Sequence, residues 1–191
     1  MDPLLPSISI LVPARNEAQH LPQIIHQLVH QDYPKDKLEV ILVDDHSTDG
    51  TLAIGHLMQV RHPEFHAISL EEGHEGKKAA ISEGVFHAKG EVILQVDADC
   101  EVGPLWARTM ASQFVNQTAM VAGPIELTYG NHWLERLQAL ETQGLVSLAG
   151  GAIGAGKPNM NNGANLAYLK SVFEEINGFE GIDHVASGDD E

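Results

Sequence analysis

The sequence of 191 residues predicts an α/β fold with a mainly parallel β-sheet and helices on both of its faces. Continuous apolar runs, which are typical of strands buried on both faces, alternate with segments whose apolar residues recur at helical spacing. The hydrophobic content is 43% and the charged content is 20%, as in ordinary globular proteins. A chain of this length can also bury a substantial core.

Four apolar runs in the first hundred residues predict strands, at residues 8–12, 40–43, 66–70 and 92–96. We expect Pro13 to end the first strand, because proline cannot donate a backbone hydrogen bond. Helical spacing predicts helices over residues 21–28, 51–58 and 79–85, and a further helix after Pro104. Strand and helix therefore alternate through this half of the chain.

The pattern loosens after about Met120. In this part the sequence predicts strands at residues 121–123, 125–129 and 165–168, and helices at residues 133–148 and 171–176. A Gly/Asn-rich loop separates the first of these helices from the last strand. We expect this part to pack against the sheet and to shape a second site.

The charge balance is strongly acidic, with 11 Lys and Arg residues against 27 Asp and Glu residues and a formal net charge of -16. Such a field repels nucleic acid and anionic lipid headgroups, so we expect no nucleic-acid partner. A phosphate-bearing ligand would need a local source of positive charge, and a divalent cation could supply it.

The single cysteine, Cys100, excludes an intramolecular disulfide and a multi-cysteine zinc site. The first seven residues lack the basic and apolar regions of a signal peptide, which predicts a cytoplasmic protein. The longest uncharged stretch, residues 142–156, is shorter than the ~20 apolar residues of a membrane-spanning helix.

Polar clusters follow three of the predicted strands, at Pro13–Glu17, Asp44–Ser47 and Asp97–Asp99. One such cluster alone is as well explained by a turn or a helix cap. Ligands of open parallel sheets bind outside the carboxyl ends of the strands. Three clusters at one edge of the same sheet therefore indicate a binding site.

Asp97 and Asp99 are two residues apart, so an extended backbone would point both carboxylates to the same side. Two close carboxylates repel each other unless a cation lies between them or one of them is protonated. Hard oxygen ligands suit Mg²⁺ or Mn²⁺, which commonly combine one or two carboxylates with substrate phosphate oxygens. Such an ion would hold a diphosphate and stabilise it as a leaving group.

An ordered set of short motifs resembles the signatures of family 2 glycosyltransferases, which have the GT-A fold. The motifs are Val12–Glu17, Val43–Asp49, Asp97–Asp99, Asn162–Asn165 with Gly178–Phe179, and Gly188–Glu191. The resemblance implies transfer of a sugar from a nucleotide-diphosphate sugar to an acceptor hydroxyl. It also implies that residues 1–119 form the half that binds the nucleotide sugar. Residues 120–191 would form the acceptor-side half, incomplete at its C-terminus.

The resemblance also assigns roles by position. It implies nucleotide contacts from Pro13, Arg15, Glu17, Asp44, Asp45, Lys77 and Asp97. For Lys77, a solvated lysine at a helix start is an equal alternative. Asp97 and Asp99 would hold Mn²⁺ or Mg²⁺, with Asp99 as the firmer ligand. Asp189 and Asp190 would be catalytic, with Asp190 as the general base for the acceptor hydroxyl, and a single base opposite the leaving group implies inversion.

The resemblance implies two partners. One is a nucleotide-diphosphate sugar, with UDP as the expected nucleotide, and the other is a saccharide or lipid-linked acceptor. A QxxRW-type segment and membrane helices follow the last motif in many relatives, whereas this sequence stops at Glu191. We therefore expect a longer protein that can lie at the cytoplasmic face of a membrane, and we expect turnover to require that longer chain.

Three other functions would require different features of the sequence. A sugar-nucleotide pyrophosphorylase would need a glycine-rich basic loop after the first strand, and Pro13–Glu17 has no glycine. An NAD-dependent dehydrogenase would need G-x-G-x-x-G at the same turn. A binding module of the same fold without catalytic activity is opposed by the intact acidic motifs.

Overall fold

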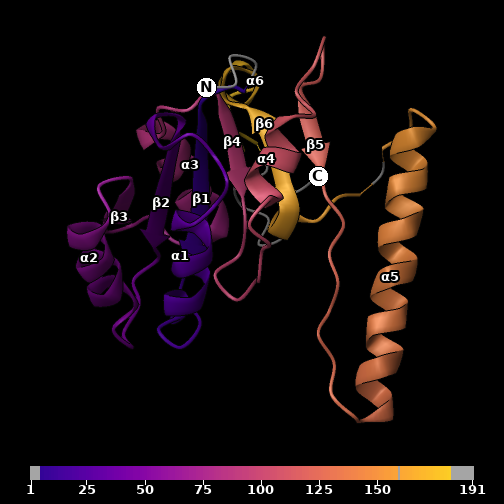
Figure 1. Ribbon diagram of the computed structural model, residues 1–191, viewed down its shortest axis with the longest axis horizontal. Helices are drawn as coiled ribbons and strands as arrows, with labels where there is room; N and C mark the ends of the chain where they lie inside the picture. Colours follow the sequence, from indigo (N-terminus) through magenta and orange to yellow (C-terminus); the bar gives the residue numbers. More distant parts are fainter. Residues whose placement is uncertain (1–4, 159, 182–191) are drawn as a thin grey trace.

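The computed structural model describes residues 5–158 and 160–181. Within these residues, one sheet contains β1 (Ile8–Ala14), β2 (Leu38–Asp44), β3 (Phe65–Ser69), β4 (Val92–Gln95), β5 (Met120–Ala122) and β6 (Leu166–Leu169). The helices are α1 (Leu21–Val29), α2 (Thr51–Arg61), α3 (Lys77–His87), α4 (Trp106–Ala111), α5 (Trp133–Gly154) and α6 (Lys170–Glu175). Figure 1 shows this arrangement, which confirms the predicted α/β fold.

The strand order is β3-β2-β1-β4-β6-β5. Strands β1 to β4 run parallel to one another, whereas β6 runs antiparallel to both β4 and β5. From β1 the chain moves outward through β2 to β3, and it then returns to place β4 on the other side of β1. The strand order therefore reverses between β1 and β4, and open α/β sheets bind their ligands at such a switch point.

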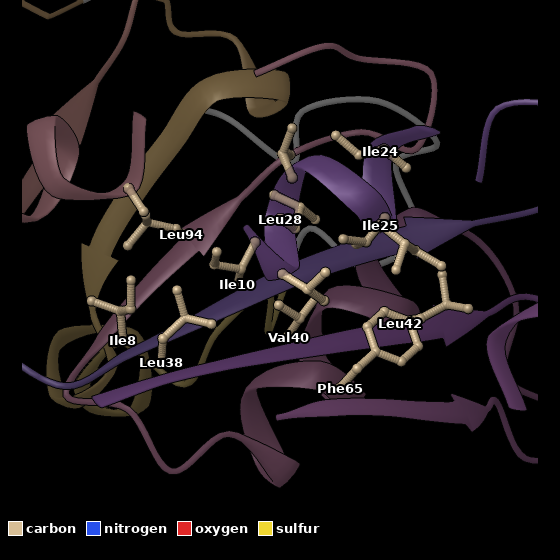
Figure 2. Packing of buried hydrophobic residues seen from close by; sticks show 14 of the residues in the cluster. Ile8, Ile10, Ile24, Ile25, Leu28, Leu38, Val40, Leu42, Phe65 and Leu94 are labelled. Carbon is tan, nitrogen blue, oxygen red and sulfur yellow. The ribbon is translucent and has the colours of Figure 1, made fainter. Parts of the chain in front are cut away.

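Both faces of the sheet are covered, because successive side chains of a buried strand point to opposite sides. Ile10 and Leu42 lie in the larger apolar cluster with Leu28 of α1, and Figure 2 shows these side chains packed together. Leu11 and Val43 lie in the second cluster, which includes the apolar residues of α3. Helices α1, α2 and α4 thus cover one face, and α3 covers the other together with Phe173 of α6.

The first strand continues past the point where the sequence predicted its end. Pro13 lies within β1 and is paired with Val43 of β2. The pairing of β1 with β4 stops at Leu11, so at Pro13 no hydrogen bond to β4 is needed. The strand tolerates proline there for this reason, and it delivers Pro13 and Ala14 to the edge of the sheet.

The strand predicted at residues 125–129 is absent from the described structure, where residues 123–130 have no regular secondary structure. Side chains from elsewhere donate hydrogen bonds to carbonyl groups of this segment, which in a sheet would accept from a neighbouring strand. The Asn165 amide donates to the Pro124 carbonyl at 2.8 Å, and the Gln143 amide donates to the Ile125 carbonyl at 3.0 Å.

Helix α5 is longer than predicted, ending at Gly154 instead of Leu148. Gly156 follows it with a φ of 71°, and the backbone nitrogen of Lys157 donates to the Ala152 carbonyl at 2.9 Å. A left-handed glycine is a common helix terminator, so Gly156 is the sequence signal that marks the end of α5.

Figure 1 shows α5 standing apart from the layers of the sheet. Ala139 is its single buried residue among the described positions, and several of its large apolar side chains are exposed. Among the described helices, none is both long and apolar enough to cross a membrane.

Candidate functional site

A cavity of about 420 Å³ opens at the carboxyl ends of β1, β2 and β4, where the strand order reverses. The first residues of α3 close it from the side. Its charged lining consists of Arg15, Glu17, Asp45, Lys77, Asp97 and Asp99, and Pro13 also contributes. Of the nucleotide and metal residues predicted from the sequence, the structure brings all except Asp44 to this cavity.

The two loops that follow β1 and β2 are joined by hydrogen bonds. The backbone nitrogen of Asn16 donates to the Ser47 hydroxyl at 2.8 Å, and the Asn16 side-chain oxygen accepts from the Thr48 nitrogen at 2.8 Å. The backbone nitrogen of Glu17 donates to the Thr51 hydroxyl, also at 2.8 Å. Asn16 has a φ of 59°, a conformation that asparagine adopts more readily than most residues. These bonds fix the loops that carry the cavity residues.

Asp45 is held from two sides, and its side chain is 7% exposed. Its Oδ2 accepts from the guanidinium of Arg15 at 3.3 Å and from the backbone nitrogen of Gly76 at 3.0 Å. Its Oδ1 is buried and has no hydrogen-bond partner within the described part of the protein. A donor on a bound ligand could satisfy this oxygen, since a buried acceptor without a partner is costly.

Asp44 does not line the cavity, although the sequence placed it with the nucleotide-binding residues. It is the last residue of β2 and is 1% exposed. Its Oδ2 accepts from the backbone nitrogen of Ser47 at 3.1 Å, which stabilises the loop. Neighbouring residues of a strand point to opposite faces, so Asp44 and Asp45 could not both face the cavity from an extended backbone.

Glu17 and Arg15 occupy the loop after β1. The Glu17 carboxylate lies 2.8 Å from Nδ1 of His20, and its side chain is partly buried. The Arg15 side chain is 56% exposed while it contacts Asp45, so it can reorient towards a ligand.

Asp97 and Asp99 both line the cavity, but not through the extended backbone that the sequence predicted. Strand β4 ends at Gln95, and Ala98 and Asp99 form a turn. The backbone nitrogen of Cys100 closes this turn by donating to the Asp97 carbonyl at 3.1 Å. The turn leaves Asp97 half-buried and Asp99 exposed.

Lys77, the first residue of α3, contacts Asp97. Its Nζ lies 2.9 Å from Oδ1 and 3.2 Å from Oδ2 of that carboxylate. Lys77 therefore has a carboxylate partner at this cavity, and its contact with a nucleotide stays a prediction.

The residues present fit a divalent cation that also needs ligand oxygens. Among the residues that the structure describes, the charged lining contains two basic and four acidic side chains, so its formal net charge is -2. No cluster of three or more metal-binding side chains occurs among the described residues. A site with only two carboxylates suits Mg²⁺ or Mn²⁺, because these ions commonly take further oxygen ligands from phosphates. A closed structural site would supply all of its ligands from the protein.

Burial raises the pKa of the Cys100 thiol to about 11, and the negative charges of Asp97 and Asp99 add to this effect. A raised thiol pKa keeps the group protonated and unreactive at neutral pH. At pH 8 we expect alkylation by iodoacetamide to be about 100-fold slower than for an unperturbed cysteine. The rate measured against pH should still rise between pH 9 and 10, and a plateau below pH 9 would contradict the assignment.

A second cavity, of about 360 Å³, lies between α5 and the chain after β5. None of the described residues that line it carries a charged side chain. Its wall includes Ala122, which pairs with Leu166 of β6, and Leu166 pairs in turn with Gln95 at the end of β4. The uncharged cavity thus lies at the same edge of the sheet as the charged one. The amide of Gln95 donates to the Gly163 carbonyl at 2.9 Å, which ties the end of β4 to the segment before β6.

Gly76 is a cavity residue that the sequence analysis missed. Its nitrogen binds Asp45, and its φ of 91° is one that glycine adopts without strain. A glycine directly before a helix and next to Lys77 was the available signal. The predicted catalytic residues Asp189 and Asp190 lie outside the described residues.

Comparisons with known proteins agree with this geometry. The family model for glycosyl transferase family 2 matches residues 9–176. Glycosyltransferase AglE of Haloferax volcanii is 28% identical in a match that covers 100% of this chain and 60% of the relative. The mannosyltransferase PcManGT from Pyrobaculum calidifontis, solved with GDP-Man and Mn²⁺, has a TM-score of 0.70 at 24% identity over 91% of this chain. S. aureus TarS, solved with UDP-GlcNAc, has a TM-score of 0.58 at 21% identity over 90% of this chain.

This chain spans 60% of the length of AglE and covers 47% of each of the two solved chains. The structural likenesses confirm the predicted GT-A fold. The family model matches most of the chain, from the second residue of β1 to the residue after α6. The protein therefore belongs to glycosyl transferase family 2.

Proposed function

We propose that the protein is a glycosyltransferase that moves a sugar from a nucleotide-diphosphate sugar to an acceptor hydroxyl, with help from a divalent cation. The observation that carries this proposal is the charged cavity at the switch point between β1 and β4. Family membership supports it as well.

The nucleoside would lie against the loops after β1 and β2. Oδ1 of Asp45 is a buried acceptor without a partner in the described structure, and a base N–H could donate to it. Arg15 and Glu17 lie beside it on the same cavity, where the ribose would be held, and Pro13 would contribute an apolar contact. We favour UDP as the nucleotide, and the structurally similar TarS was solved with UDP-GlcNAc.

The diphosphate would lie at the other end of the cavity, near Asp97, Asp99 and Lys77. Asp99 and Asp97 would hold Mn²⁺ or Mg²⁺, which when bound would neutralise charge that develops on the leaving diphosphate. Lys77 would add a positive charge from the start of α3. PcManGT, which shares the fold, was solved with Mn²⁺.

The acceptor would approach from the half formed by residues 120–191, which we propose as the acceptor side of the protein. Asp190, with Asp189 beside it in the sequence, would accept the proton of the attacking hydroxyl, and the single base implies inversion. The uncharged cavity next to α5 favours an acceptor with an apolar portion, so a lipid-linked saccharide fits better than a charged polymer. A cytoplasmic location, with the longer protein at a membrane face, stays a prediction.

Thermal unfolding of the chain with UDP, GDP, CDP or NAD in the presence of Mn²⁺ tests the nucleotide assignment. A ligand at a hundred times its dissociation constant stabilises the protein by ~2.7 kcal/mol, which raises the melting temperature by several degrees. We expect the largest shift with UDP. A larger shift with GDP or CDP would change the nucleotide, and a shift with NAD alone would contradict a sugar-nucleotide site.

A further inference from the structure

Each cation of the charged cavity already contacts a carboxylate. Arg15 lies 3.3 Å from Asp45, and Lys77 lies 2.9 Å from Asp97. Asp99 is exposed, and no carboxylate–cation contact shorter than 4 Å is found for it within the described residues. Asp97 and Asp99 therefore differ in how readily they can accept an additional cation.

The ammonium of Lys77 contacts both carboxylate oxygens of Asp97. It is within 3.2 Å of both carboxylate oxygens, so it occupies the edge through which this carboxylate would hold a metal ion. The two side chains are 34% and 32% exposed, so water screens the contact only in part. A divalent cation that binds Asp97 must push the ammonium away, because the two positive charges repel each other.

The position of Lys77 is itself fixed from the nucleotide side of the cavity. The preceding residue, Gly76, donates its backbone N–H to Asp45 at 3.0 Å. The adjoining residues Gly76 and Lys77 thus contact Asp45 at one end of the cavity and Asp97 at the other. An ammonium displaced from Asp97 would remain tethered next to the place proposed for the diphosphate.

We propose that Lys77 is a resident counter-ion of Asp97 that makes binding of the metal and binding of the nucleotide diphosphate depend on each other. Without nucleotide, Lys77 competes with the metal ion and keeps its affinity low. With nucleotide, the diphosphate gives the displaced ammonium a new partner, so metal and nucleotide bind more tightly together than separately. This inference rests on the proposed function, and coupling of this kind is reciprocal.

Calorimetric titration with Mn²⁺ alone tests the competition, using the wild-type chain, Lys77→Met and Lys89→Met. Lys89 is exposed and follows the far end of α3, so Lys89→Met makes the same change in net charge away from the cavity. We expect Mn²⁺ to bind Lys77→Met about 10-fold more tightly than the wild type, and Lys89→Met to change the affinity less than about 2-fold.

Titration with UDP in saturating Mn²⁺ tests the second half of the inference. We expect UDP to bind Lys77→Met about 10-fold more weakly than the wild type, because the diphosphate loses the ammonium. The substitution then has opposite effects on the two ligands. A lysine that served only the structure of the loop would weaken both of them.

The inference is overturned if Mn²⁺ alone binds Lys77→Met no more tightly than Lys89→Met. It is also overturned if neither of the two variants binds Mn²⁺ measurably. Lys77→Gln repeats the test should the methionine variant fail to fold by circular dichroism. If the wild type binds no nucleotide with Mn²⁺, the proposed function fails instead, while the titration with metal alone still decides whether Lys77 competes for Asp97.

Discussion

Replacing Asp99 by alanine is expected to abolish the stabilisation that UDP and Mn²⁺ together give to the protein. Asp99 is exposed on the charged cavity, whereas Asp97 is covered by Lys77, so Asp99 is the carboxylate to which a metal ion has direct access. At UDP a hundred times its wild-type dissociation constant, the expected loss is ~2.7 kcal/mol. Thermal unfolding with and without both ligands measures it.

Asp36→Ala is the matched control for this substitution. It removes the same charge from an exposed residue of the short 3-10 helix at Lys35–Lys37, which does not line the cavity. We expect this variant to keep the full stabilisation by UDP and Mn²⁺. Equal losses in both variants would mean that the ion responds to net charge alone, and full stabilisation of Asp99→Ala would remove Asp99 from the metal site.

Replacing Phe65 by alanine is expected to lower the free energy of unfolding by about 3–5 kcal/mol. Phe65 is the first residue of β3 and is completely buried. It lies in the apolar cluster with Leu42 and Leu28, as Figure 2 shows. Alanine would leave a cavity between the edge of the sheet and its helices, and urea unfolding measures the cost.

Phe86→Ala makes the same chemical change at a position that is 78% exposed. Its expected effect is within about 0.5 kcal/mol, as for most surface substitutions. The difference between the two variants therefore reports burial, since the residue type is the same. A loss below about 1 kcal/mol for Phe65→Ala would contradict the packing of β3 against this core.

The parallel part of the sheet was predictable because its signals are local. Runs such as Val40–Val43 are apolar throughout, and a strand with that pattern must be buried on both faces. The antiparallel placement of β6 beside β4 was not predictable, because the periodicity of a strand does not indicate which other strand it pairs with. The prediction of a strand at 125–129 was wrong for a similar reason. Asn165 and Gln143, which are distant in the sequence, donate to the carbonyl groups of Pro124 and Ile125 at the start of this segment.

In the candidate site, too, some features were predictable from local sequence patterns and others depend on contacts between distant parts of the chain. Parallel strands bring their carboxyl ends together, so the convergence of Asp45 with Asp97 and Asp99 followed from the fold. The orientation of Asp44 away from the cavity also followed from strand alternation, although the sequence analysis did not use it. The contact between Lys77 and Asp97 depends on how α3 is aligned across the sheet, and no sequence pattern encodes that distance.

A calorimetric titration of the wild-type chain with UDP, once with Mn²⁺ and once after its removal by EDTA, tests the central claim most directly. The proposed site predicts clear binding with Mn²⁺ and binding at least about 10-fold weaker without it, because the metal neutralises the charge between carboxylates and diphosphate. Equal affinity under both conditions would contradict a metal-assisted site, and absence of UDP binding under both would contradict the assignment of this cavity to UDP.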